Sequence, residues 1–256
     1  MIMVSDKHEK KVKRVKPNNL RQDKTPIVVA VAVALIVFLI VYFFLNKQNT
    51  DYKKIKQYKN NYLVYTKYQS TSTQYPVQIP FVNIKSEAID AVNKDIDLFV
   101  NDFVKSKKSV VSYEYSISGI ILSVIVKVID YDTEYAPFPY FRSYNINIST
   151  LEVNADQSLL DYYSISENEV EEIVEDKFHF YHDELISKEF YAADECDYEC
   201  FLRNRDIGNY LEKAVYYVDS GNLVAYIPFS FYSIFGEEDY FKDDNFKFLL
   251  VEGRVE

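Results

Sequence analysis

The chain has 256 residues, of which 48% are apolar and 27% are charged, and its formal net charge is −10 at pH 7. This composition is sufficient for a folded core, and the acidic balance argues against nucleic acid as a partner. With only five glycines, the sequence contains neither GxGxxG nor GxxxxGK[ST], so the usual phosphate-binding loops are absent.

Residues 26–46, PIVVAVAVALIVFLIVYFFLN, are the most informative stretch. Residues 27–45 carry no charge, and as a helix they would measure about 28 Å, close to the thickness of the hydrocarbon core of a bilayer. Tyr42, Phe43 and Phe44 suit the aromatic belt at one interface, and no small-residue cleavage site follows. The stretch is predicted to be an uncleaved transmembrane helix with the lipid bilayer as its partner; a signal peptide or a buried helix is the alternative.

Charge near this helix does not decide its orientation, because residues 12–26 and residues 46–60 each hold five basic side chains. The wider chain is asymmetric: residues 1–26 hold eight basic and three acidic side chains, whereas residues 69–256 hold fifteen basic and thirty-five acidic ones. A basic tail is attracted to the anionic cytoplasmic leaflet, so the N-terminus is expected inside the cell and the bulk outside. The predicted organisation is a cytoplasmic basic tail (1–25), the transmembrane helix (26–46), a juxtamembrane linker (47–60) and an extracytoplasmic domain (61–256).

The domain begins with a predicted strand, NYLVYTKYQ (61–69), and a short extended segment framed by two prolines. Residues 82–106 predict an amphipathic helix, because apolar residues recur at spacings of four and three. The predicted buried stripe is Ile84, Ala88, Val92, Ile96, Phe99 and Phe103.

Two β-branched segments follow, residues 109–118 and 120–131, with Gly119 at a tight turn between them. The prolines of residues 135–140 predict a loop, and residues 140–150 alternate as a strand. A second helix is predicted over residues 159–188, with a capping box formed by Ser166 and Glu169. Its predicted buried stripe is Val170, Val174, Phe178, Tyr181 and Leu185.

Residues 189–210 are irregular and charged, which predicts a loop. Residues 214–231 predict two strands joined by a hairpin turn at 219–222, and residues 246–253 predict a final strand. Six or seven strands and two helices that do not alternate strictly predict an α+β fold, in which two helices pack on a mostly antiparallel sheet preceded by one transmembrane helix.

Three segments, taken in order, resemble a known bacterial domain. They are YPVQIPFVNIKSEAIDAVNKDIDLFV, SYNINISTLEVNADQSLLDYY and AVYYVDSGNLVAYIPFSFYSIFG. The family is the extracytoplasmic domain shared by lysozyme-sensing anti-sigma factors and the non-catalytic N-terminal half of peptidoglycan deacetylases, and the resemblance covers residues 61–251. Family members carry a histidine-bearing loop before the SYN motif, whereas this chain has TEYAPFPYFR there, so contacts made by that histidine do not carry over.

The resemblance implies a non-catalytic binding module of the cell envelope whose ligand is peptidoglycan or a protein that acts on it. The expected contact surface is the loop at 135–142 with the chain after the hairpin. Its expected binding residues are Tyr135, Tyr140, Arg142, Tyr232 and Phe235. Aromatic and arginine side chains suit a sugar or protein face, although they also suit packing within a sheet.

Cys196 and Cys200 are spaced for a small disulfide ring outside the cell, for two free thiols, or for a metal site shared with His179 and His182. Neither spacing is that of a zinc finger, so no metal or other cofactor is expected, and the ordinary expectation places His182 beside the buried stripe and His179 in solvent. Without a recognisable catalytic motif, no enzyme activity is expected. The alternatives are an anti-sigma-factor-type transmembrane sensor, which would need residues 1–25 to bind a sigma factor, and a metal-dependent envelope hydrolase.

Overall fold

The computed structural model describes residues 58, 62–133, 137–188, 196–230 and 245–253. All of them belong to one compact unit, Asp51–Glu256, and the remainder of the chain, Met1–Thr50, forms a separate unit. The transmembrane helix predicted at 26–46 lies outside the described residues. Within the part of the chain that is described, no helix is both long enough and apolar enough to cross a bilayer.

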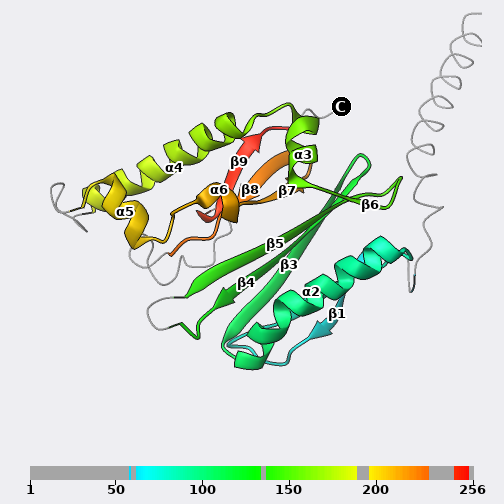
Figure 1. The fold of residues 1–256 in the computed structure, drawn as a ribbon. Helices are drawn as coiled ribbons and strands as arrows, with labels where there is room; N and C mark the ends of the chain where they lie inside the picture. The colour runs from blue at the N-terminus through cyan, green and yellow to red at the C-terminus, as the bar shows by residue number, and fades with distance from the viewer. Residues whose placement is uncertain (1–57, 59–61, 134–136, 189–195, 231–244, 254–256) are drawn as a thin grey trace, which may run out of the picture. The chain divides into compact units, whose positions relative to one another are not determined.

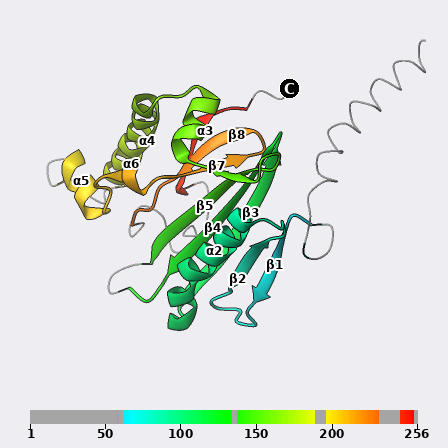
Figure 2. The ribbon, with the colours of Figure 1, turned by 45° about the vertical axis from the view of Figure 1, so that its right-hand side comes forward.

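The first half of the unit is built on a four-stranded antiparallel sheet in the order β3-β4-β5-β6 (Figure 1). Its strands are β3 (Ser109–Ser118), β4 (Ile121–Asp130), β5 (Phe138–Asn147) and β6 (Glu152–Asn154). The helix α2 (Glu87–Ser106) lies on one face of this sheet, beside an antiparallel pair formed by β1 (Val64–Gln69) and β2 (Gln78–Val82) (Figure 2).

The second half carries the sheet β7-β8-β9 and four helices. The strands are β7 (Val215–Asp219), β8 (Asn222–Tyr226) and β9 (Lys247–Val251). The helices are α3 (Asp156–Tyr163), α4 (Glu167–Ser187), α5 (Tyr198–Asn204) and α6 (Tyr210–Lys213). The predicted α+β class with mostly antiparallel sheets is therefore confirmed, but the described residues hold five helices rather than two.

β4 is buried on both faces, and it separates two hydrophobic cores. Its even-numbered residues from Leu122 to Val128 pack in the core under α2. Ile121 and Ile125 face the other way, into the core formed with α4 and β7–β9. A strand covered on both sides reads as a continuous apolar run, which is why residues 120–131 are so rich in isoleucine and valine.

A polar seam joins the two sheets inside the second core. The amide Nδ2 of Asn145 on β5 donates to the carbonyl of Tyr216 on β7 at 2.9 Å. The Ser123 hydroxyl on β4 donates to Asn145 Oδ1 at 2.6 Å and accepts from the backbone N–H of Val218 at 3.3 Å. The outer edge of β7 thus gains hydrogen bonds from side chains of the β3–β6 sheet, and its backbone groups are satisfied although they are buried.

The stripe predicted for the first helix is confirmed at Val92 and Ile96, which are buried, and Phe99 and Phe103 pack against the same core, but the prediction is wrong at its start. The helix begins at Glu87, so Ile84 precedes it, and Ala88 is exposed. The buried face includes a polar residue, Asn93, whose side-chain amide bonds both the N–H and the carbonyl of Val82, at 2.8 and 2.9 Å. The buried residues of α2 are Ile89, Val92, Asn93, Ile96 and Val100.

The second predicted helix is divided into α3 and α4. Ser164, in the left-handed conformation with φ 55°, ends α3, and the predicted capping box of Ser166 and Glu169 starts α4. The predicted stripe is confirmed, because all five of its residues are buried.

Two predicted loops are partly wrong. β5 begins at Phe138, inside the loop predicted at 135–140. Pro139 pairs with Ile129 of β4 on one side, but β6 does not reach this part of β5 on the other side. Proline is tolerated at such an edge position because no hydrogen bond from its nitrogen is required there. α5 forms within the predicted loop at 189–210, where Asp197 caps it by accepting from the N–H of Cys200 at 2.9 Å.

Candidate functional site

A pocket of about 460 Å³ opens on the face of the β3–β6 sheet that is turned away from α2. We call it the Lys127 pocket. It is lined by Thr73, Gln74, Pro76, Val110, Ser112, Lys127, Ile129, Phe141 and Phe246. Its size is in the range of cavities that hold small molecules, and its walls are mainly apolar with a few polar groups.

The strand register explains the floor of the pocket. Lys127 of β4 pairs with Ser112 on one side and with Phe141 on the other, so these three side chains lie in one row across the sheet. Val110 and Ile129 pair in the next row. Alternation along each strand places both rows on the same face, so a hydroxyl, an ammonium group and an aromatic ring meet on an apolar floor.

Lys127 is the most unusual residue of the pocket, because only 5% of it is exposed. Its Nζ donates to Glu114 Oε1 at 2.7 Å and lies 5.1 Å from the centroid of the Tyr226 ring. The Glu114 side chain is 47% exposed, so the pair has one buried and one hydrated partner. A buried ammonium group needs such an anion and an aromatic face to offset its lost hydration.

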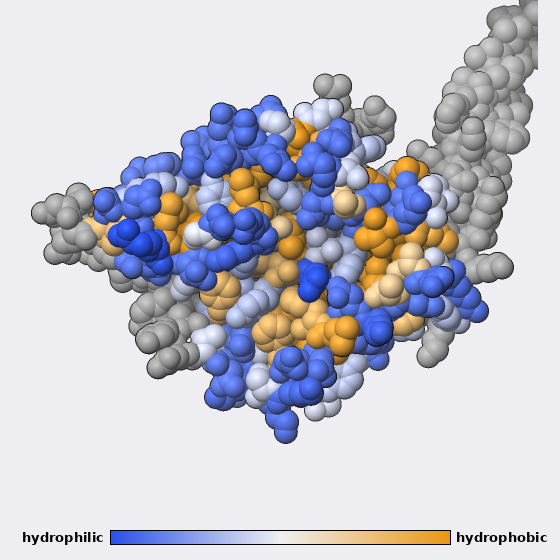
Figure 3. All heavy atoms as spheres, in the orientation of Figure 1, coloured by the Kyte–Doolittle hydropathy of each residue, from blue (hydrophilic) through white to orange (hydrophobic). Residues whose placement is uncertain are grey.

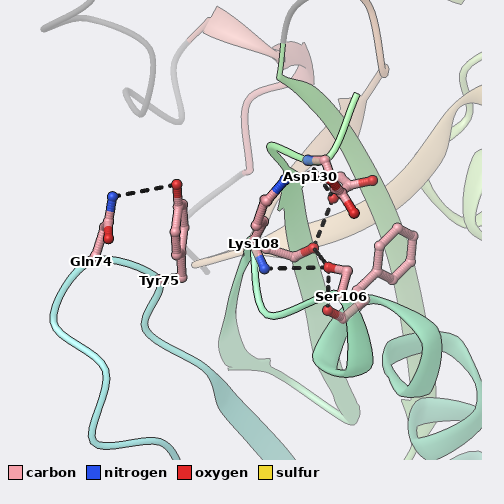
Figure 4. A network of polar contacts seen from close by, with 8 residues as sticks. Gln74, Tyr75, Ser106, Lys108 and Asp130 are labelled. Atoms are coloured by element: carbon pink, nitrogen blue, oxygen red, sulfur yellow. Dashed lines mark hydrogen bonds and ion pairs between the residues drawn. The ribbon is translucent and has the colours of Figure 1, made fainter. Parts of the chain in front are cut away.

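The connection between β1 and β2 forms one wall of the pocket. It is closed by a hydrogen bond of 2.9 Å between the N–H of Ser70 and the carbonyl of Val77, and the carbonyl of Pro76 accepts from the N–H of Val111 at 3.0 Å. Gln74 and Tyr75 stand at the outer end of this wall (Figure 4), where the Tyr75 ring packs 5.4 Å from that of Tyr131.

Next to that wall, Figure 4 shows a polar network where α2 ends and β3 begins. The Ser109 hydroxyl donates to Asp130 at 2.8 Å and contacts the Ser106 hydroxyl at 3.1 Å. Lys108 Nζ bonds Asp132 at 2.7 Å, and this carboxylate raises the pKa of Lys108. The network fixes the ends of β3 and β4 that carry the floor of the pocket.

A larger concavity, about 760 Å³, lies between α4 and the β7-β8-β9 sheet. There Lys177 Nζ donates to the carbonyl of Lys247 at 2.6 Å and lies 4.5 Å from the Phe248 ring. Lys247 Nζ in turn bonds Asp219 at 2.5 Å, which lowers the pKa of that carboxyl. Both ammonium groups contact the ends and edges of strands, so we assign this concavity a structural role and take the Lys127 pocket as the candidate site.

Of the expected binding residues, Tyr135, Tyr232 and Phe235 lie outside the described residues. Tyr140 and Arg142 lie on the α2 side of β5, not in the pocket. The Tyr140 ring is 4.9 Å from Phe103 of α2, and the Arg142 guanidinium lies 5.3 Å from the Phe99 ring. Phe141, between them, lines the pocket, so the expected segment does contribute to the site, but through a residue that is not among the expected binding residues.

Cys196 and Cys200 are bonded to each other, with their sulfurs 2.02 Å apart. His182 is buried, and its Nε2 lies 3.0 Å from the carbonyl oxygen of Cys196, whereas the exposed His179 stacks on Tyr198 at 3.7 Å. Among the residues that the structure describes, no three His, Cys, Asp or Glu side chains gather as a metal site would require.

The sequence carries one signal for this site. In IILSVIVKVIDY, Lys127 interrupts a strand whose neighbouring residues are almost all apolar, and a lysine in such a strand must find an anion or a ligand. Its partners Phe141 and Phe246 come from distant segments and could not be inferred from local spacing. In comparisons with known proteins, no family model and no curated protein matches the chain.

Proposed function

We propose that the chain is a single-pass membrane protein of the bacterial cell envelope whose folded unit lies outside the cell and binds the cell wall, or a protein that acts on the wall, without catalysis. The apolar residues 27–45 support the membrane anchor, with the basic tail inside. The order of the three family-like segments supports the cell wall as the source of the ligand.

The main support for a binding role is the Lys127 pocket. An ammonium group on an apolar and aromatic floor suits a ligand that combines a carboxylate with a sugar or apolar face. Cell-wall glycopeptides have both, because their muropeptide units join sugar rings to peptides that end in carboxylates. A ligand carboxylate would take the place of Glu114, whose half-exposed side chain can turn into water.

The test is sedimentation of the full-length protein, in mild detergent, with insoluble peptidoglycan. We compare Lys127→Met, which keeps the apolar stem and removes the charge, with Lys105→Met on α2, whose side chain is 67% exposed. A charge-assisted hydrogen bond contributes about 1.5–3 kcal/mol, so Lys127→Met should weaken binding roughly ten- to hundredfold, while Lys105→Met should bind like the wild type.

Equal binding by both variants would remove the pocket from the proposal, and no sedimentation of the wild type would remove peptidoglycan as the ligand. Capture of a muramidase in place of peptidoglycan would favour the wall-acting protein. Muropeptide turnover that requires added metal and is lost in His179→Ala would favour the hydrolase. Co-purification of residues 1–25 with a sigma factor would favour the transmembrane sensor.

A further inference from the structure

The exposed apolar side chains of the described residues are not evenly spread. Twelve large hydrophobic residues are exposed, and six of them lie at the end of the unit where the chain enters it. We call this set the entry-end cluster. It consists of Tyr58, Tyr62, Tyr115, Ile117, Ile120 and Val153, whose exposed fractions range from 41% to 65%.

The path of the chain explains why these residues meet. α2 ends where β3 begins, with the hydroxyls of Ser106 and Ser109 3.1 Å apart, and β3 then runs back along the helix. A helix of 20 residues and a strand of 10 residues are both about 30 Å long. The turn between β3 and β4, with Ile117 and Ile120, therefore lies level with the first turn of α2.

Hydrogen bonds bring the other members to the same end. The Tyr58 hydroxyl bonds Asp90 in the first turn of α2 at 2.8 Å, and the backbone carbonyl of Tyr62 accepts from Asn83 at 2.8 Å. The N–H of Ile148, just before β6, donates to the carbonyl of Ile120 at 2.8 Å. Figure 3 shows apolar surface, in orange, over the part of the unit where Figure 1 places β6 and the β3–β4 turn.

The length of the linker ties this end to the bilayer. The predicted transmembrane helix ends at residue 46, and only eleven residues separate it from Tyr58. Fully extended, they span at most about 40 Å, so the entry end stays within about 40 Å of the end of the predicted transmembrane helix. The exposed side chains of Glu87, Asp90 and Glu152 lie at this end with one exposed lysine, Lys85, over the Tyr58 ring, so acidic groups outnumber basic ones and the proposed attraction to lipid is apolar.

We propose that the entry-end cluster contacts the bilayer, with Ile117 and Ile120 among the acyl chains and the two N-terminal tyrosines at headgroup level. This inference rests on the membrane anchor of the proposed function and adds an orientation to it. Lys127 lies six residues along β4 from Ile121, about 20 Å from the cluster end. With the cluster at the bilayer, the Lys127 pocket would therefore lie outside the lipid, on the sheet face turned away from α2.

The chain has no tryptophan, which allows a direct test with single-tryptophan variants of the full-length protein. Ile117→Trp and Ile120→Trp probe the cluster. Tyr140→Trp is the matched control, because Tyr140 is 37% exposed and lies at the opposite end of the sheet. Leu35→Trp probes the predicted transmembrane helix. Each protein is reconstituted into phosphatidylcholine vesicles with or without lipid brominated on its acyl chains.

Brominated lipid should quench the emission of Ile117→Trp and Ile120→Trp and shift their spectra to shorter wavelength, while Tyr140→Trp stays unquenched. Quenching should survive added salt and should not need anionic lipid, because the contact is apolar. If Leu35→Trp is quenched but both cluster variants behave like Tyr140→Trp, the inference fails and the anchor stands. If Leu35→Trp is also unquenched, the anchor fails and the inference with it. A variant is included only if its far-UV circular dichroism spectrum matches that of the wild type, which shows that it folds.

Discussion

Replacing Asn145 by alanine should break the polar seam between the two sheets. The change removes the hydrogen bond to the Tyr216 carbonyl and the one accepted from Ser123. Asn145 is 2% exposed and Ser123 is fully buried, so water cannot restore either bond. Each stranded buried group costs about 1–3 kcal/mol, so the two groups together give a loss of roughly 2–6 kcal/mol in the free energy of unfolding. For a unit of this size, at about 2–4 °C per kcal/mol, Tm should fall by about 4–24 °C.

The assay is urea unfolding of the compact unit Asp51–Glu256, followed by far-UV circular dichroism. Asn101→Ala is the matched control, because the Asn101 side chain is exposed on α2 and its amide donates to the neighbouring Asp102. Its effect should stay within about 0.5 kcal/mol. If Asn145→Ala lowers the free energy of unfolding by no more than this control does, the seam does not hold the sheets together and the prediction is wrong.

Three further changes test separate features of the fold. Lys247 lowers the folded-state pKa of Asp219, so this pair stabilises the fold above the carboxyl's ordinary pKa of 3.8, and the stabilisation is lost as pH falls through the lowered value. Acid titration should therefore show a shallower loss of stability below about pH 4 for Asp219→Asn than for the wild type; identical curves would contradict the pairing. Ser166→Ala removes the N-cap of α4 and should lower the free energy of unfolding, measured by urea titration, by about 1 kcal/mol; an unchanged urea midpoint would contradict the role of this cap. Reducing the Cys196–Cys200 bond opens a very small ring, so thermal unfolding with and without reductant should differ by about 2 kcal/mol or less; a larger loss would mean that the bond does more than close this ring.

Local signals in the sequence predicted local structure well. Gly119 marks the β3–β4 turn in the left-handed conformation, with φ 55°, and the 219–222 turn joins β7 to β8. Ser166 and Glu169 form the predicted capping box. Each of these features depends on a few consecutive residues, which is why spacing alone reveals them.

Features that depend on tertiary contacts were not predictable in the same way. Asn93 turns inward because it can bond both backbone groups of Val82, and a count of apolar residues cannot include such a partner. The candidate site joins Lys127 to Phe246, which are more than a hundred residues apart. The expected binding residues Tyr140 and Arg142 were chosen by residue type, but strand alternation turns them toward α2 and presents Phe141 to the pocket.

β4 gives the unit a property that neither core would have alone. A fragment ending at β6 would leave Ile121 and Ile125 against water, and a fragment starting at α3 would lose the surface on which β7 rests. We therefore expect neither piece to survive as a soluble product of expression or proteolysis. The two halves should unfold together in one cooperative transition.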